Sequence, residues 1–179
     1  MKPILLVVAH EGFQPLEYSV PKNILSAADF EVKTASDLEG VAISAINQTA
    51  VKVDLALKNV VVSDYEGIFF IGGPRALEFL DNETSYWVIR ETAKTSRVWG
   101  AICISPRILV AAGVLSGKKV TGWDGDGELA DILKKADAIY VPSPVVIDGN
   151  LITANGPAAA EEFGQAIVKL LNYGNLETN

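Results

Sequence analysis

The chain contains a single cysteine, Cys103, directly after an apolar run, Val98–Ile102. The next segment, Ser105–Ala112, has helical periodicity, so we expect Cys103 to lie in a tight turn between a strand and a helix. Such a turn exposes the thiol at the sheet edge, where the N–H groups and positive dipole end of the helix favour the thiolate. A lone cysteine often serves instead as a small buried hydrophobic residue. The position between strand and helix favours a reactive thiol.

Glu17 is a candidate partner for this thiol. It falls in the first turn of a predicted helix, Pro15–Ala28, which follows an apolar run, Ile4–Ala9. An acidic side chain at this point ordinarily complements the helix dipole. The carboxyl could instead point toward the same crevice as Cys103. Burial and a neighbouring thiolate would then raise its pKa, the protonated carboxyl would donate to the thiolate, and the two groups would titrate as a coupled pair.

Backbone N–H groups near Cys103 could hold a developing negative charge. Gly72 and Gly73 follow the apolar run Gly67–Ile71, and glycine permits close approach of the backbone. With the N–H of Ile104, directly after the cysteine, they could form an oxyanion hole for attack on a carbonyl or nitrile-like carbon. An ordinary glycine turn explains Gly72 and Gly73 equally well.

The order of the predicted elements decides whether these groups meet. Apolar runs alternate with helical periodicities, which indicates an α/β fold with a mostly parallel sheet, helices on both faces and a small appended hairpin. The predicted strands are Ile4–Ala9, Phe30–Ala35, two pieces within Val41–Asp54, Gly67–Ile71, Val98–Ile102, Lys118–Thr121, Ile139–Val141, Val145–Ile147 and Leu151–Thr153. The predicted helices are Pro15–Ala28, Arg75–Leu80, Glu83–Thr95, Ser105–Ala112, Glu128–Lys135 and a final one with an apolar stripe from Phe163 to Leu171. Ligands bind outside the carboxyl ends of such strands. We therefore expect three loops to converge there, those that follow Ile4–Ala9, Gly67–Ile71 and Val98–Ile102.

Three connecting segments have turn or loop character. His10–Phe13 and Gly122–Gly127 are predicted loops, and Asp148–Asn150 predicts the turn of a hairpin. Asp124, Asp126 and Glu128 are spaced somewhat like a calcium loop, but the later ligands and the final glutamate are missing. We therefore interpret these acids as a solvated loop and expect no metal.

Length and composition limit the other possibilities. With 179 residues, 49% of them hydrophobic, the chain fits one domain, residues 1–179, with a full core. One cysteine and one histidine exclude an internal disulfide, provide no zinc site and suit a reducing compartment. A net charge of -7 without a basic stripe argues against nucleic acid and favours a small molecule or a protein as partner. The apolar run near the N-terminus is too short to span a membrane and lacks a cleavage site, so we expect a soluble, cytoplasmic protein without a cofactor.

Five motifs, taken together, resemble a known family. They occur in the order GFQPLE, FFIGGP, AICISPRIL, GKKVTGW and VVIDGNLITANGP, over nearly the whole chain. The chain is similar to the ThiJ/PfpI superfamily, the cysteine branch of the class I glutamine amidotransferase-like fold, which includes deglycases and PfpI-type intracellular proteases. The resemblance implies a flavodoxin-like three-layer sandwich and a homodimer. It also implies that Cys103 is the nucleophile, that Glu17 bonds its sulfur and that Gly72 and Gly73 bind the oxyanion.

The chain departs from this pattern at several positions. Peptidase-like members have a histidine where this chain has Ile104, deglycase-like members have one in the segment that matches VTGW, where this chain has Trp123, and Gln14 replaces an acid. The single histidine, His10, follows the first predicted strand and is either a hydrogen-bonded loop residue or a donor in the site. We take His10, Trp123 and Asn155 as candidate pocket residues, with Trp123 either walling the pocket or anchoring its loop.

Three functions are compatible with these residues. The first is a Cys103-dependent enzyme that acts on small carbonyl, amide or related electrophiles as an amidase, hydratase or glyoxalase-like catalyst, without Cys–His peptidase activity. The second is a redox-responsive stress or interaction protein whose cysteine is oxidised to sulfinic acid. The third is a scaffold in which the cysteine is structural. The reactivity of Cys103 separates the first two from the third.

Overall fold

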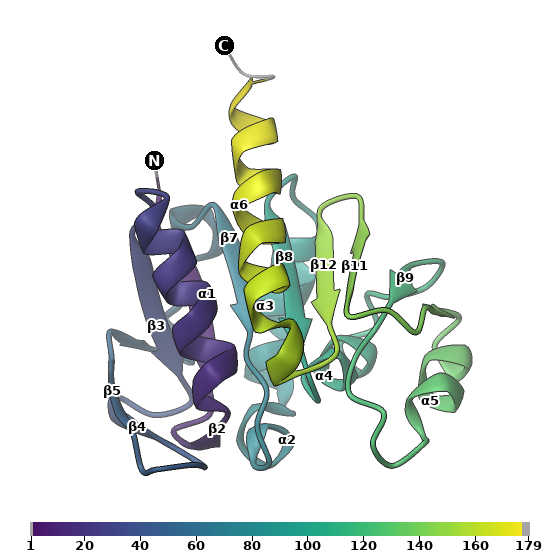
Figure 1. The fold of residues 1–179 in the computed structure, drawn as a ribbon, viewed down its shortest axis with the longest axis horizontal. Coiled ribbons are helices and arrows are strands. Elements are labelled where there is room, and N and C mark those ends of the chain that lie inside the picture. Colours follow the sequence, from purple (N-terminus) through teal and green to yellow (C-terminus); the bar gives the residue numbers. More distant parts are fainter. Residues whose placement is uncertain (1, 177–179) are drawn as a thin grey trace.

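The computed structural model describes residues 2–176, in which a central sheet lies between helices (Figure 1). This sheet has seven strands, in the spatial order β11 (Val145–Asp148), β12 (Leu151–Ala154), β8 (Val98–Ile102), β7 (Gly67–Phe70), β1 (Ile4–Val8), β3 (Val32–Ser36) and β6 (Leu55–Ala56). All neighbouring pairs are parallel except β11 and β12. β1, β7 and β8 are buried along their whole length, as their continuous apolar sequences require. The prediction of a mostly parallel sheet is confirmed.

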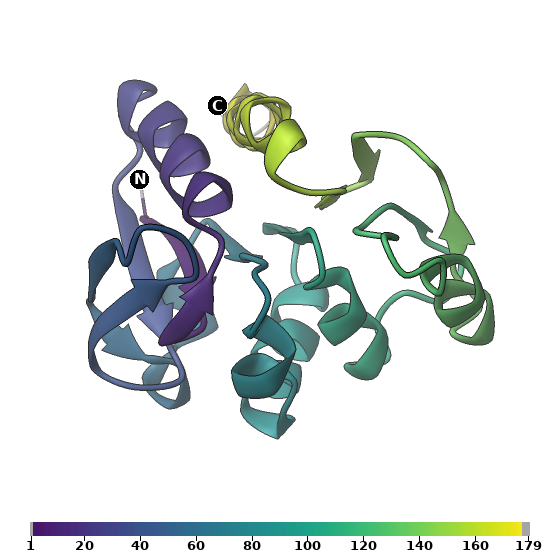
Figure 2. The same ribbon diagram turned by 60° about the horizontal axis from the view of Figure 1, so that its bottom comes forward.

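Helices cover both faces of the sheet. Their bounds are α1 (Pro15–Ala27), α2 (Ala76–Leu80), α3 (Glu83–Ala93), α4 (Pro106–Ala111), α5 (Leu129–Lys135) and α6 (Ala160–Leu176). α1 and α6 pack side by side on one face, and α2, α3 and α4 lie on the other (Figure 2). The three-layer α/β sandwich is therefore confirmed. Within the described residues, none of these helices combines the length and apolar character needed to cross a membrane.

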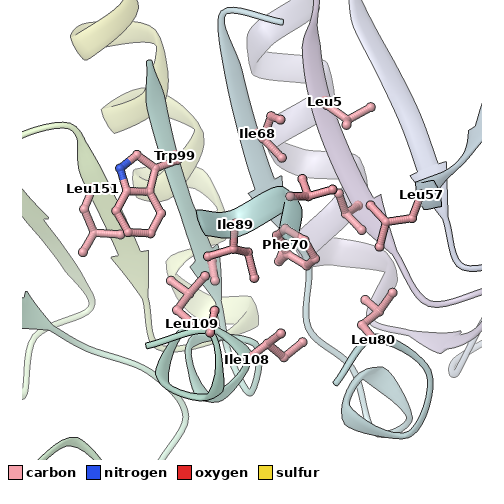
Figure 3. Close-up of a cluster of buried hydrophobic side chains, with 14 of the residues drawn as sticks. Leu5, Leu57, Ile68, Phe70, Leu80, Ile89, Trp99, Ile108, Leu109 and Leu151 are labelled. Atoms are coloured by element: carbon pink, nitrogen blue, oxygen red, sulfur yellow. The ribbon is translucent and has the colours of Figure 1, made fainter. Parts of the chain in front are cut away.

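Two hydrophobic clusters join the sheet to its helices. Alternate residues of β1 enter different clusters, with Leu5 on the side of α3 and α4 and Leu6 on the side of α1 and α6. Figure 3 shows the first cluster, where Phe70 and Ile89 lie together between sheet and helix. In the second cluster the rings of Phe69 and Phe163 meet edge to face, with centroids 5.7 Å apart. This packing gives the loops at the carboxyl edge a rigid support.

Two smaller sheets flank the central one. β2 (Glu11–Phe13), β4 (Gly40–Ser44) and β5 (Ala50–Val53) form one sheet, and β9 (Lys119–Val120) and β10 (Ile139–Tyr140) form the other. The prediction that His10–Phe13 is a loop is wrong, because Glu11–Phe13 pairs with β4 in parallel. So short a strand is defined by its partner rather than by its own sequence. The two-residue strand β6 and the single-turn helices at Leu57–Asn59 and Val62–Asp64 were not predicted for the same reason.

The predicted hairpin is present, but it is part of the central sheet. β11 and β12 are antiparallel and joined across Gly149, whose φ of +61° suits the turn. β12 also pairs in parallel with β8, so that Ala154 lies beside Ile102 at the carboxyl edge. The hairpin therefore supports the strand that delivers the cysteine.

Candidate active site

Cys103 occupies a strained turn at the end of β8. Its φ is +64°, a left-handed conformation that non-glycine residues rarely adopt. The turn is fixed on both sides, because Cys103 N–H donates to Ala154 O at 2.9 Å and Trp123 N–H donates to Cys103 O at 2.7 Å. Behind it, Ser105 Oγ donates to Ile71 O at 2.9 Å. The geometry is that of a nucleophile elbow, as the strand–turn–helix pattern predicts.

The glycines beside the elbow make room for Cys103 and Glu17. A Cβ on Gly72 would lie 2.6 Å from Cys103 Cβ and 2.6 Å from Glu17 Oε2, closer than atoms can approach. Gly73 has a φ of +139°, and a Cβ there would overlap the backbone of Gly12 and Phe13. Both positions therefore require glycine.

Glu17 lies fully buried beside the cysteine. Its Oε2 accepts a hydrogen bond from Gly72 N–H at 3.1 Å. Its Oε1 is also buried, and no N–H or O–H group of the described residues donates to it. The side chain thus points inward to the sulfur rather than complementing the helix dipole from the surface.

The protonation of Glu17 and Cys103 is coupled. Burial raises the pKa of Glu17 from 4.5 to about 7, although hydrogen bonding with Cys103 and with Gly72 N–H acts in the opposite direction. Burial also raises the pKa of the Cys103 thiol, and the charge of Glu17 raises it further, while the N–H groups of Ile104 and Gly73 lower it. The N–H groups beside Cys103 favour the thiolate, as the sequence predicts, but desolvation outweighs them. Above about pH 7 the pair carries one negative charge rather than two.

The three candidate oxyanion donors have different roles in this arrangement. Gly72 N–H is already engaged by Glu17. The N–H groups of Gly73 and Ile104 act on the sulfur of Cys103. These two amides are the ones that a negative charge developing at the sulfur would meet.

Cys103 opens into a cavity of about 540 Å³ at the carboxyl edge of the sheet. The lining residues are Gln14, Glu17, Gly73, Pro74, Leu77, Cys103, Ile104, Arg107, Trp123, Asp126 and Pro157. Most of these side chains are apolar, and Gln14 also caps α1, since its Oε1 accepts from Leu16 N–H at 2.7 Å. The cavity thus combines an apolar wall with a few polar groups, as small-molecule sites do.

Arg107 was not among the residues predicted from the sequence. Its side chain is only 13% exposed, and Nη2 donates to Asp126 Oδ1 at 2.7 Å. Its guanidinium carbon lies 5.7 Å from the centre of the Trp123 ring, a cation–π arrangement. The hydrogen bond with Arg107 lowers the pKa of Asp126. A signal was present, because Arg107 lies in the first turn of the helix that follows the cysteine.

The acidic loop that includes Asp126 has a structural explanation. Asp124 Oδ1 accepts from Leu129 N–H at 2.8 Å, near the start of α5, and Asp126 pairs with Arg107. Across residues 2–176, no three His, Cys, Asp or Glu side chains come together as a metal site. The acids of this loop therefore order it and orient Arg107.

Of the three candidate pocket residues, one lines the cavity. Trp123 does, and it is 38% exposed. His10 does not, because its Nδ1 lies 2.5 Å from Asp37 Oδ2 and its ring packs on Phe79 at 4.1 Å between centroids. Asn155 is exposed and is not among the lining residues, and its backbone N–H donates to Pro144 O at 3.0 Å. His10 thus matches the hydrogen-bonded loop histidine that the sequence left open.

Comparisons with known proteins agree with this geometry. The model of the DJ-1/PfpI family matches residues 2–170. An uncharacterised protein of Methanocaldococcus jannaschii is 33% identical over 173 residues, which cover 96% of this chain and 83% of the relative. A deglycase of Thermococcus kodakarensis is 30% identical over 168 residues, which cover 93% and 98%. The crystal structure of a ThiJ/PfpI domain protein from Brachyspira murdochii superposes with a TM-score of 0.89 at 25% identity, over 97% of this chain and 99% of that one. The chain belongs to the DJ-1/PfpI family.

Proposed function

We propose that the protein is a cysteine-dependent enzyme that acts on small carbonyl, amide or related electrophilic substrates. The observation that carries this proposal is the strained Cys103 turn, open to a cavity and paired with a buried carboxyl whose pKa is about 7. A carboxyl with this pKa exchanges protons readily near neutral pH. The relative named a deglycase supports a carbonyl-derived substrate.

The proposed first step follows from the positions of these groups. Cys103 Sγ attacks the electrophilic carbon, and the thiol proton passes to the Glu17 carboxylate. The carbon–sulfur bond forms as the π bond of the carbonyl breaks and its electron pair moves to oxygen. The N–H groups of Gly73 and Ile104 hold this oxyanion. Glu17 then returns its proton to the oxygen or to a leaving group.

The walls of the cavity favour a small substrate. About 540 Å³ accommodates a compact molecule, to which Leu77, Ile104 and Trp123 offer apolar contacts. We do not propose Cys–His peptidase chemistry, because His10 is bound by Asp37 and is absent from the lining. The homodimer that the resemblance implies stays a prediction, and mass measurement in solution checks it.

The test is turnover of a panel of small aldehydes, α-oxo aldehydes, α-oxo acids and amides. Cys103→Ala should abolish turnover because the nucleophile is gone, and Glu17→Gln should reduce it strongly because the proton acceptor is gone. Lys94→Gln, at an exposed residue directly after α3, is the matched control and should retain full activity. Turnover that survives in Cys103→Ala would contradict the proposal.

A second function is favoured by the same thiol. The cavity offers no histidine as a proton carrier among its lining residues, yet the thiol stays accessible beside Glu17. A redox-responsive protein would use two equivalents of hydrogen peroxide, the first converting the thiol to sulfenic acid and water, the second converting sulfenic to sulfinic acid and water. Intact-mass measurement after mild peroxide should then show two added oxygens on Cys103 without turnover on the panel. An unmodified cysteine would exclude this function.

A further inference from the structure

Arg107 supplies the only positively charged side chain among the described residues that line the cavity. Its burial is costly, since a guanidinium gives up five hydrogen bonds to water unless the protein replaces them. The structure replaces few of them. Nη2 bonds Asp126, while Nη1 lies 3.9 Å from Glu128 Oε2, too far for a hydrogen bond.

A further donor of Arg107, its Nε atom, also lacks a hydrogen-bond partner among the described residues. This atom is buried. A buried charged donor without a partner costs more than an ordinary hydrogen bond contributes. So poorly satisfied a buried charge needs an explanation, and an anion that pairs with the guanidinium group from the cavity is one. Asp126 and Trp123 hold the guanidinium in place, so its remaining donors are fixed in advance.

The charge of the Cys103 and Glu17 pair also affects what the cavity binds. Above about pH 7 the Cys103 and Glu17 pair carries one negative charge, which repels an anionic substrate. The other lining carboxylate, Asp126, is already bound by Arg107 and by Glu128 N–H at 3.1 Å. Free guanidinium donors in a largely apolar cavity would offset the repulsion and select for a planar anion, the geometry that arginine binds best.

We propose that Arg107 determines specificity by binding a carboxylate next to the electrophilic carbon of the substrate, so that the preferred class is α-oxo acids and related small carboxylates. The proposal rests on the proposed function in that Cys103 is the attacking group. Arg107 acts in binding, through the guanidinium N–H groups that Asp126 does not engage.

Two reagents of nearly equal shape and different charge test this selection. Iodoacetate and iodoacetamide both alkylate Cys103, whose sulfur displaces iodide, and intact mass gives the rate for each. We expect the ratio of the iodoacetate to the iodoacetamide rate to fall roughly tenfold in Arg107→Gln, as the loss of a charged hydrogen bond predicts. Arg107→Lys, which keeps the charge without the planar fork, should lie between. Lys94→Gln makes the same change in net charge at an exposed ion pair with Glu91 and should leave the ratio unchanged.

The outcomes separate this role from a structural one. If Arg107 only supports the loop, Arg107→Gln slows both reagents alike, the ratio stays constant and the proposal is overturned. An increased ratio would also overturn it. Alkylation needs no turnover. If the ratio of the two alkylation rates falls as expected in Arg107→Gln but the unaltered protein turns over nothing on the substrate panel, the proposed function is contradicted and the carboxylate selection stands.

A measurement on the unaltered protein covers the case in which Arg107→Gln does not fold. Pyruvate and its neutral amide, pyruvamide, compete with iodoacetamide for the cavity. We expect pyruvate to protect Cys103 at a roughly tenfold lower concentration, because only pyruvate has the carboxylate. Equal protection by the two compounds would refute the proposal without any variant.

Discussion

Gly72 N–H donates a hydrogen bond of 3.1 Å to Glu17 Oε2, and a Cβ on Gly72 would lie 2.6 Å from that same oxygen. The glycine therefore both admits the carboxyl and holds it inside the protein. One N–H donor does not replace the hydration of a carboxylate, so burial still dominates and the pKa of Glu17 rises to about 7. The Cys103 thiol, next to it, titrates together with this group.

The alkylation of Cys103 should depend on pH in a way that reports Glu17. In the unaltered protein the pair loses its first proton near pH 7, so the iodoacetamide rate should rise through pH 7 and then level off. Glu17→Gln cannot ionise, so this step should disappear and the rate should follow the ionisation of Cys103 alone. Rates between pH 5 and 10 check this. A step near pH 7 that persists in Glu17→Gln would show that Glu17 is not its source.

The same group should make folding stability depend on pH. The folded state keeps the Glu17 proton up to about pH 7, whereas the unfolded chain loses it near the ordinary value of 4.5. The contribution is therefore fully present below pH 4.5 and is lost as the pH rises through 7. At about 1.4 kcal/mol per pH unit over this window, it amounts to roughly 3 kcal/mol.

Urea unfolding of the unaltered protein and of Glu17→Gln checks this linkage. The glutamine side chain of the variant has no charge to desolvate, so the free energy of unfolding of the variant, relative to the unaltered protein, should increase between pH 4.5 and pH 8. A difference between the two proteins that does not vary with pH would contradict the burial-driven pKa of Glu17.

Gly72→Ala should damage the site and the stability together. The added methyl group would overlap Cys103 Cβ and Glu17 Oε2, and such overpacking typically costs 1–3 kcal/mol, so we expect a loss of about 2 kcal/mol. Displacing Glu17 should also slow Cys103 alkylation at pH 7. Gly113→Ala is the control, because its φ of +75° strains an alanine while nothing lies within 4 Å of the added carbon. It should lose about 1 kcal/mol with the alkylation rate unchanged.

The sequence predicts the elements with strong periodicity and misses those that depend on a partner. β8 has the predicted bounds, Val98–Ile102, and α1 ends one residue before the predicted end. Each contains enough regularly spaced apolar residues for its own sequence to predict it. By contrast, Glu11–Phe13 becomes a strand only because β4 lies beside it. Short elements of this kind are set by tertiary contacts, which a local pattern does not contain.

Some features of the site are likewise predicted by the sequence, and others are not. The position of Cys103 follows from the strand and helix around it, and the approach of Glu17 follows from the shared carboxyl edge of the sheet. The raised pKa of the thiol does not follow, because a pattern of residues says nothing of how far burial outweighs nearby N–H groups. Nor does the role of Arg107, which depends on a loop 19 residues away folding back to bring Asp126 to it.

The strain at Cys103 predicts an inverted order of stability for two variants. Glycine adopts a φ of +64° without penalty, whereas alanine keeps the clash of its Cβ. Cys103→Gly should therefore be more stable than Cys103→Ala by about 1 kcal/mol in urea unfolding. At the exposed helical residue Ala111 alanine should be more stable than glycine, so Ala111→Gly should lower the free energy of unfolding by about 1 kcal/mol. A Cys103→Ala variant more stable than Cys103→Gly would show that the turn is not strained.

His10 tests whether the single histidine of the chain takes part in the chemistry. Its Nδ1 faces Asp37, its backbone N–H donates to Asp37 Oδ1 at 2.8 Å, and its ring rests on Phe79. His10→Ala removes the side-chain hydrogen bond and the ring contact, so the free energy of unfolding should fall by about 1–2 kcal/mol. The alkylation rate of Cys103 and turnover on the substrate panel should stay within about twofold, since general acid–base catalysis typically contributes a hundredfold or more. Loss of turnover on that larger scale in a folded His10→Ala protein would mean that the histidine reaches the cavity during the reaction, and the proton exchange assigned to Glu17 would have to be divided between the two residues.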